Sequence, residues 1–586
     1  MSTESQGVFL PVSEVFPDTE SSFATFKSLL LDLSLNDALF WCARFNLIIS
    51  SPGDDHLTKQ QFVLNQLFTA EEISRVNDFV GRHGGAQSVS IFFRGQLQEL
   101  IWWILLYCHN LPGDGTTFEN PEVRRKFAKA ALIASDIWSE RVFTGRFSLD
   151  GGITVARKRS LGSIRKSIEA TMRTPNLPQS LGRGWALFTE YFPRYYPSFE
   201  EEFRQATHLS VEEYYICVTA IVINFMNPKI GAGIFNVHEL INSPSYGSVF
   251  QKYLKLESQT ENELRGSLWG IDNNIVKDPP RVDYNLLPLR EKPIFFVKDG
   301  RAIILDPIFY SEKASIGPLF LLPQEKREKA FADFGKAFED YVCNILERTF
   351  PDITGAVNKR LSCNIVGTVQ KGQEVEIDAC LNDVADIVLF ETKTGLIRED
   401  KILIDDYEKY LHHLREKYVE SHQGNKGIGQ LAKIINMLAS RKWLGENQEF
   451  SEAERIFPVL VVHDPLLSAP VYGHFFASEF DRLLEPDSRP QFGTCLKGNL
   501  RITLPIVITI DDLENLETSI EYFAFRDLLS DYSRTCPDRL ESLHNFIAFS
   551  HYKHHMYHNR NIASAGLAII EKSKNAIFPE AKDKAF

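Results

Sequence analysis

Apolar residues recur at helical spacing from about residue 20 to residue 275. The segments 69–72 and 210–213 read Thr-Ala-Glu-Glu and Ser-Val-Glu-Glu, which is typical of a capping box at a helix N-terminus. One broad apolar stripe occupies positions i, i+4, i+7, i+8 and i+11 and consists of Leu97, Ile101, Ile104, Leu105 and Cys108. We therefore expect a mainly α-helical N-terminal half with its own core, and its pattern indicates no particular function.

The pattern changes after residues 277–293, a Pro-rich segment that we interpret as a domain boundary. Two apolar runs, 294–297 and 302–305, flank an Asp-Gly dipeptide, which favours a tight β-hairpin. The Asp-x-x-Glu sequence at 511–514 predicts the cap of a further helix. The other elements expected up to about residue 516 are a helix at 325–350, strands at 361–369, 372–380 and 385–393, helices at 401–419 and from Gly427, and strands at 459–462 and 506–510.

This order of elements predicts a multidomain protein with an α/β core, in which helices flank a mixed central sheet. We expect a helical accessory or recognition region at 1–290, with two subdomains divided near 174–184 as an alternative. The α/β domain, with its leading hairpin, is expected at 291–520. A helical extension is expected at 521–586.

Composition and charge restrict the class of protein. The chain has 586 residues, 44% of them hydrophobic, and a formal net charge of -13, which argues against coating nucleic acid by bulk electrostatics but allows a local basic groove. The N-terminal sequence does not resemble a signal peptide. The longest apolar runs, 101–108 and 216–226, are too short to span a bilayer. We therefore expect a cytoplasmic protein with no membrane partner.

The eight cysteines are scattered along the chain and include no Cys-x-x-Cys pair. This spacing predicts neither a zinc knuckle nor a disulfide framework. No Walker-type phosphate-binding loop is present either, so we do not expect the chain itself to hydrolyse ATP. The reducing cytoplasm is consistent with this cysteine usage.

Charged residues stand at the ends of two predicted neighbouring strands. Side chains alternate along a strand, so Glu376 and Asp378 share one face, and Glu391 and Lys393 share another. If residues 382–383 form the turn of a hairpin, these acidic faces meet. Carboxylates in close proximity repel one another unless a cation lies between them, and oxygen ligands suit a hard ion such as Mg²⁺.

Glu339 interrupts an otherwise apolar stripe of the helix predicted at 325–350. Gly335, Val342 and Leu346 are the other members of this stripe. A buried carboxylate is normally paired or bound to a metal ion. Alternatively, Glu339 lies at the edge of the stripe and reaches water.

Four segments, in this order, resemble the PD-(D/E)XK nuclease superfamily, which has the restriction-endonuclease-like fold. They are a helix with Gly335-Lys-Ala-Phe-Glu339, a strand with Glu376-Ile-Asp378, a strand ending in Glu391-Thr-Lys393 and a helix beginning near Gln430. The resemblance covers about residues 325–516. Ile377 stands where the family has a proline, and Glu-x-Lys also occurs at 399–401 and 580–582, but only Glu391 follows a strand-like apolar run.

The resemblance implies a catalytic site that hydrolyses phosphodiester bonds with Mg²⁺, or with Mn²⁺. Asp378 and Glu391 would be the metal ligands, and Glu339 would be an accessory carboxylate of the metal shell. Lys393 would position the attacking water. Gln430 would contact the substrate or support a metal ligand.

Two further clusters of polar residues could bind a ligand. The basic passage contains Arg157, Lys158, Arg159, Arg165 and Lys166. These residues could contact phosphates, or they could form a solvated helix face or loop. Four histidines between 551 and 558 would share one face if they lay on a helix, and we interpret them as a polar surface.

We therefore expect a nuclease, most simply one that acts on DNA as an endonuclease or exonuclease. Its architecture is analogous to that of effectors of bacterial defence against phages and plasmids. A partner protein, or another copy of the chain, could bind the helical half. The alternatives are a non-catalytic nucleic-acid-binding or scaffold protein with the same fold, and a ribonuclease.

Overall fold

The structure, a computed structural model, forms two compact units that are not continuous in sequence. The first comprises Met1–Trp185, Glu200–Leu322 and Ala565–Phe586, and the second comprises Ala186–Phe199 and Pro323–Ser564. The residues described are 8–51, 56–85, 89–110, 120–143, 176–225, 233–269, 286–297, 300–352, 360–369, 374–383, 385–395, 407–422, 424–439, 443–444, 454–484, 494–497 and 500–577.

The expected boundaries near residues 290 and 520 both fall inside a compact unit. The hairpin that was expected to lead the α/β domain belongs to the first unit. Its strands β5 (Ile294–Phe296) and β6 (Arg301–Ile304) pair antiparallel and complete a four-stranded sheet with β3 (Ile234–Asn236) and β4 (Ser258–Gln259). Strand pairing therefore ties this hairpin to the residues that precede it.

Helices dominate the first unit, as the apolar spacing predicts. Thr69 and Ser210 each accept a hydrogen bond from the backbone N–H three residues later, and Glu72 and Glu213 reciprocate, so both capping boxes are confirmed. The principal helices are α2 (Phe23–Leu31), α3 (Leu35–Ser50), α4 (His56–Leu67), α5 (Ala70–Arg82), α6 (Arg94–Tyr107), α7 (Pro121–Phe143), α9 (Leu177–Ala186), α11 (Phe199–Thr207), α12 (Val211–Phe225), α14 (Gly247–Glu257), α15 (Glu261–Trp269) and α17 (Pro307–Ser315).

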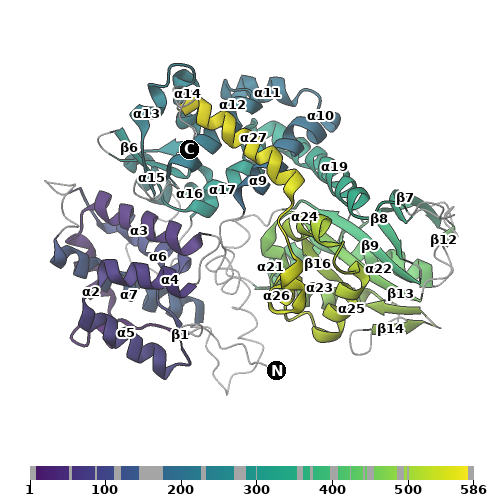
Figure 1. Ribbon diagram of the computed structural model, residues 1–586, viewed down its shortest axis with the longest axis horizontal. Coiled ribbons are helices and arrows are strands. Elements are labelled where there is room, and N and C mark those ends of the chain that lie inside the picture. The colour runs from purple at the N-terminus through teal and green to yellow at the C-terminus, as the bar shows by residue number, and fades with distance from the viewer. Residues whose placement is uncertain are drawn as a thin grey trace. The chain divides into compact units, whose positions relative to one another are not determined.

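The second unit is built on a mixed eight-stranded sheet, which runs in the order β12-β7-β8-β9-β13-β15-β14, with β16 also paired to β13 (Figure 1). β7, β8 and β9 are antiparallel, whereas β13 is parallel to β9, β15 and β16. The strands are β7 (Leu361–Val369), β8 (Glu374–Asp383), β9 (Asp386–Lys393), β12 (Trp443–Leu444), β13 (Arg455–Val462), β14 (Thr494–Lys497), β15 (Leu500–Thr503) and β16 (Ile506–Thr509).

Helices before, between and after these strands complete an α/β unit. The predicted helices at 325–350 and from Gly427 are confirmed as α19 and α22. The helix predicted at 401–419 is confirmed over Tyr407–Tyr418 as α21, and its first six residues lie outside the described residues. Helix α23 was not predicted. The described helices are α19 (Gln324–Thr349), α21 (Tyr407–Tyr418), α22 (Ile428–Ala439), α23 (Pro470–Leu483), α24 (Ile510–Ser519), α25 (Phe525–Thr535) and α26 (Leu543–Phe549). The last helix, α27 (Arg560–Ile577), begins in this unit, but its residues from Ala565 onward belong to the first unit.

A proline in the central strand β13 marks the point where its partner changes. Pro458 lacks a backbone N–H and would normally interrupt a central strand. The pairing with β15 ends at Ile456, and the pairing with β16 begins at Val459. Pro458 therefore lies at a gap between two partner strands on one side, while it pairs with Leu389 of β9 on the other.

Three local predictions are wrong. Residues 382–383 do not form the hairpin turn, because Asp383 still pairs with Asp386. Thr509, and not Asp511, is the N-cap of α24, and its side chain accepts a hydrogen bond from the N–H of Asp512. The histidines do not share a helix face, because the 3₁₀ helix His551–His555 ends before His558.

A disulfide joins Cys343 of α19 to Cys363 of β7, which contradicts the expectation drawn from the scattered cysteines. The two residues are 20 positions apart in sequence, and the packing of helix against strand brings them together. Within the described part of the chain, no helix is long and apolar enough to cross a membrane.

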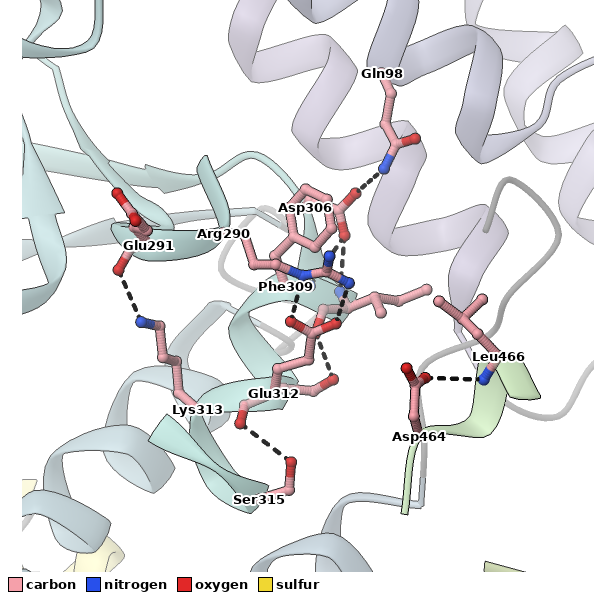
Figure 2. Close-up of polar contacts among 12 residues, drawn as sticks. Gln98, Arg290, Glu291, Asp306, Phe309, Glu312, Lys313, Ser315, Asp464 and Leu466 are labelled. Carbon is pink, nitrogen blue, oxygen red and sulfur yellow. Dashed lines mark hydrogen bonds and ion pairs between the residues drawn. The ribbon is translucent and has the colours of Figure 1, made fainter. Parts of the chain in front are cut away.

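Asp306 organises a buried polar network in the first unit. One of its oxygens accepts hydrogen bonds from Arg94 Nε and Gln98 Nε2, both at 2.8 Å, and the other caps α17. Arg94 and Asp306 are each 2% exposed. Figure 2 shows the side-chain amide of Gln98 pointing toward the carboxylate of Asp306. The network thus joins α6 to the start of α17.

We predict that Asp306→Ala destabilises the protein by about 3–5 kcal/mol, because it leaves the Arg94 guanidinium buried without its carboxylate partner. Urea unfolding monitored by circular dichroism measures this change. Arg204→Ala is the control: it removes an ion pair with Glu200 whose side chains are 58% and 48% exposed, and it should cost less than about 1 kcal/mol. Similar unfolding curves for the two variants would contradict the prediction.

Candidate active site

The pairing of β8 with β9 determines where the predicted site residues lie. The paired residues run from Asp383↔Asp386 to Ala379↔Phe390. Asp378 and Glu391 each stand one residue beyond the last printed pair. The carboxylate of Glu391 interacts electrostatically with that of Asp378, so the hairpin brings these two predicted carboxylates together, although its turn lies later than expected.

Glu391 is a buried carboxylate at the end of an apolar strand. It is 1% exposed, and its Oε1 accepts a hydrogen bond from Lys393 Nζ at 2.6 Å. Its Oε2 is buried and receives no hydrogen bond from the described residues. A buried carboxylate oxygen without a partner is costly, so this oxygen indicates that a cationic or hydrogen-bonding group belongs beside it.

Lys393 is held by two acceptors on its own strand. Besides Glu391, its ammonium donates to the backbone oxygen of Thr392 at 2.8 Å. An ammonium group has three protons, so one N–H remains for a further acceptor. With 23% of its side chain exposed, Lys393 lies at the edge of the site.

Asp378 is fixed by Thr392, the residue between Glu391 and Lys393. One oxygen of Asp378, Oδ2, accepts the Thr392 backbone N–H at 2.6 Å and the Thr392 hydroxyl at 2.8 Å. Thr392 is only 3% exposed. No role was predicted for this residue, although its hydroxyl was visible in the motif.

Glu339 comes to the site because α19 packs its apolar face into the second unit. Phe334, Phe338 and Val342 on this helix are at most 1% exposed. Glu339 itself is partly buried, and its carboxylate interacts electrostatically with Asp378 and Lys393. The structure thus places Glu339 toward the other acidic residues and not at a fully solvated edge.

Burial and mutual repulsion perturb the titration of these groups. Burial raises the pKa of Glu391 to about 8, against the opposing charge of Lys393 and with a further contribution from Asp378. Burial and the charge of Asp378 raise the pKa of Glu339 to about 7. Burial alone would lower the pKa of Lys393, but the surrounding carboxylates outweigh it and raise that pKa.

The three carboxylates are close but not gathered into a tight metal cage. Within the described residues, only Cys343, Glu347 and Cys363 bring three potential ligand atoms within 4.8 Å of one another, and there the two sulfurs are bonded together. At the acidic site, Thr392 and Lys393 each hold one carboxylate oxygen. Repulsion between the carboxylates also opposes a closer approach.

Gln430 lies beside β8 at the start of α22. Its Nε2 donates to the backbone oxygen of Glu376 at 2.8 Å, which ties the helix to the strand two residues before Asp378. Arg157, Lys158, Arg159, Arg165 and Lys166 lie outside the described residues.

A segment distant in sequence also reaches this helix. The π-helix η2 (Leu187–Tyr191) and α10 (Phe192–Tyr195) belong to the second unit. Tyr195 donates to Asp340, the neighbour of Glu339, at 2.7 Å. No sequence pattern indicated this contact, because it depends on the packing of aromatic side chains such as Phe188 against Phe334.

Comparison of the chain with protein-family models, curated proteins and solved structures finds no match.

We predict that the free energy of unfolding of the metal-free protein contains a component that falls from about pH 5 to pH 8. Glu391 and Glu339 have raised pKa values in the folded state, so in this range the folded state binds more protons than the unfolded state. This loss of stability is absent below the ordinary carboxyl pKa and reaches its full size above about pH 8.

Urea unfolding of the wild type and of Glu391→Gln in EDTA, at pH 5, 6, 7 and 8, measures this component. Because the variant lacks the titrating carboxyl, its stability relative to the wild type should rise with pH. A constant offset due to the altered contact with Lys393 does not affect this slope. A difference that stays the same at all four pH values would contradict the prediction.

Proposed function

We propose that this chain is a metal-dependent nuclease that hydrolyses phosphodiester bonds in DNA, with the second unit as its catalytic part. The observation that carries the proposal is the buried Oε2 of Glu391, which has no hydrogen-bond donor among the described residues, in a carboxylate that interacts electrostatically with Asp378, Glu339 and Lys393. A structural ion pair needs one carboxylate and one cation. Here three carboxylates from α19, β8 and β9 accompany a single lysine at the end of β9.

The topology of the second unit supports a restriction-endonuclease-like fold. Helix α19 precedes three antiparallel strands, helices follow, and β13 then pairs in parallel with β9. This is the order in which the sequence motif distributes its residues, with Glu339 on the helix, Asp378 on the second strand and Glu391 at the end of the third.

The residues fit a hard divalent cation. Asp378 and Glu391 offer carboxylate oxygens, which Mg²⁺ and Mn²⁺ accept as ligands, and Glu339 is the third acidic group. Burial, with a contribution from carboxylate repulsion, raises the pKa values of Glu339 and Glu391, and a bound cation would favour the charged form of both groups. When bound, such an ion supplies Lewis-acid polarisation of the phosphate and of a water molecule.

Lys393 has a separate role. Its ammonium is oriented by Glu391 and by the backbone oxygen of Thr392, and its remaining N–H can donate to a water or to a phosphate oxygen. Its raised pKa means that it stays charged at neutral pH. We assign it the positioning of the attacking water and the stabilisation of negative charge on the phosphate, and not proton abstraction.

The proposal is tested by incubating the purified protein with plasmid DNA, linear double-stranded DNA, single-stranded DNA and RNA, each with Mg²⁺ or EDTA. We expect cleavage of DNA with Mg²⁺ only. Lys393→Ala should reduce the rate by about 100-fold or more, the usual effect of losing one group that stabilises negative charge in the transition state. Lys255→Ala, on an exposed face of α14, is the matched control and should cut as the wild type does.

Each other outcome has a definite meaning. Cleavage of RNA alone would change the substrate class. If wild type and Lys393→Ala gave the same result on every substrate, the catalytic assignment would be wrong. Binding of nucleic acid without cleavage, even with Mn²⁺, would indicate a non-catalytic copy of the fold.

A further inference from the structure

Thr392 supplies two of the contacts that hold the predicted metal ligand Asp378. Its backbone N–H and its hydroxyl both donate to the same oxygen, Oδ2, at 2.6 and 2.8 Å. A strand N–H points sideways in the plane of its sheet. The Asp378 carboxylate therefore lies beside the backbone of β9, where an oxygen of the neighbouring strand would otherwise accept this N–H.

The double contact leaves the two oxygens of Asp378 unequal. Each oxygen of an ionised carboxylate accepts about two hydrogen bonds, so Thr392 saturates Oδ2. Oδ1 is the oxygen left to face an external ligand. The contact also fixes the side-chain rotamer, which lowers the entropy lost when a ligand binds.

The position of Thr392 shows that this is not a chance surface contact. The residue is 3% exposed and lies between Glu391 and Lys393 in the sequence. Lys393 donates a hydrogen bond to Oε1 of Glu391. The backbone oxygen of Thr392 also accepts a hydrogen bond from Lys393 at 2.8 Å. Thr392 thus contacts both Asp378 and Lys393.

We propose that Thr392 is a positioning residue that presents Asp378 to a divalent cation through the Oδ1 oxygen alone. This inference rests on the proposed function, because it assumes that Asp378 and Glu391 hold a metal ion. Thr392 itself binds neither metal nor substrate in this arrangement. Its hydroxyl acts only by fixing the carboxylate, and a side chain without a hydroxyl leaves Asp378 with the backbone N–H as its only donor from this residue.

The test measures binding of Mn²⁺ to the full-length protein by isothermal titration calorimetry. Thr392→Val, which keeps the shape but loses the hydroxyl, should weaken Mn²⁺ binding about 10-fold, the usual lower limit for loss of a group that orients a metal ligand. Thr392→Ser keeps the hydroxyl and should bind within about 2-fold of the wild type. Thermal unfolding in EDTA monitors the folding of each variant.

Thr503→Val is the matched control. Thr503 is a buried strand threonine of the same sheet, and its hydroxyl contacts only the backbone oxygen of Ile456 among the contacts described for it. This variant should bind Mn²⁺ as the wild type does. If Thr392→Val fails to fold, Thr392→Ala and Thr392→Ser give the same comparison, because they differ only in the hydroxyl.

The outcomes separate this inference from the proposed function. If the wild type binds Mn²⁺, Asp378→Asn abolishes binding and Thr392→Val binds as tightly as the wild type, the positioning role is wrong and the metal site stands. If the wild type binds no Mn²⁺, or Asp378→Asn binds it equally well, the metal site itself is wrong and the inference fails with it. Only weakened binding in Thr392→Val with recovery in Thr392→Ser supports it.

Discussion

The carboxylate of Glu391, buried at the end of a central strand, is the constraint on which the rest of the second unit depends. A charge in this position requires compensation, and the surrounding elements supply it incompletely. Lys393 pairs with one oxygen, but Asp378 and Glu339 add like charge from two other elements. The architecture therefore maintains an electrostatic imbalance that a purely structural ion pair would avoid.

Hydrophobic packing of α19 outweighs this repulsion. Six apolar or aromatic side chains of the helix are at most 3% exposed, namely Phe334, Phe338, Tyr341, Val342, Ile345 and Leu346. Each such side chain contributes about 1.5–3 kcal/mol when it is buried, and this packing holds Glu339 where burial and the charge of Asp378 raise its pKa. The helix can therefore hold Glu339 against other acids, and the disulfide to β7 adds a covalent constraint on the same pair of elements.

The sequence predicts the parts of this site that depend on local periodicity. The helix at 325–350 coincides closely with α19, because an amphipathic stripe determines it locally. The strand at 361–369 coincides with β7, although its sequence is not a continuous apolar run. Alternation along β9 places the side chains of Glu391 and Lys393 on one face and that of Thr392 on the other. It does not predict that the Asp378 carboxylate accepts hydrogen bonds from Thr392. Asp378 lies one residue beyond the last printed pair of β8 and β9, so the alternation of paired residues does not determine this contact.

Contacts between distant segments could not be predicted for a related reason. Tertiary packing brings Cys343 and Cys363 together. It also places the segment 186–199 in the same unit as α19 and the 294–305 hairpin in the first unit. Each involves residues whose local pattern is ordinary.

The contrast between Asp386 and Asp378 explains why a motif alone cannot identify the site. Both are strand aspartates within the same hairpin. Arg455 binds Asp386 with two hydrogen bonds, at 2.6 and 2.5 Å, so both oxygens of that carboxylate are neutralised within the protein. Asp378 has donors on one oxygen from Thr392 and faces two other carboxylates.

A carboxylate that its own protein has already neutralised is structural, whereas one that remains under-compensated beside other acids can gain free energy by binding a cation. Charge compensation, more than residue type or spacing, therefore distinguishes a candidate metal ligand from a structural acid in this sheet.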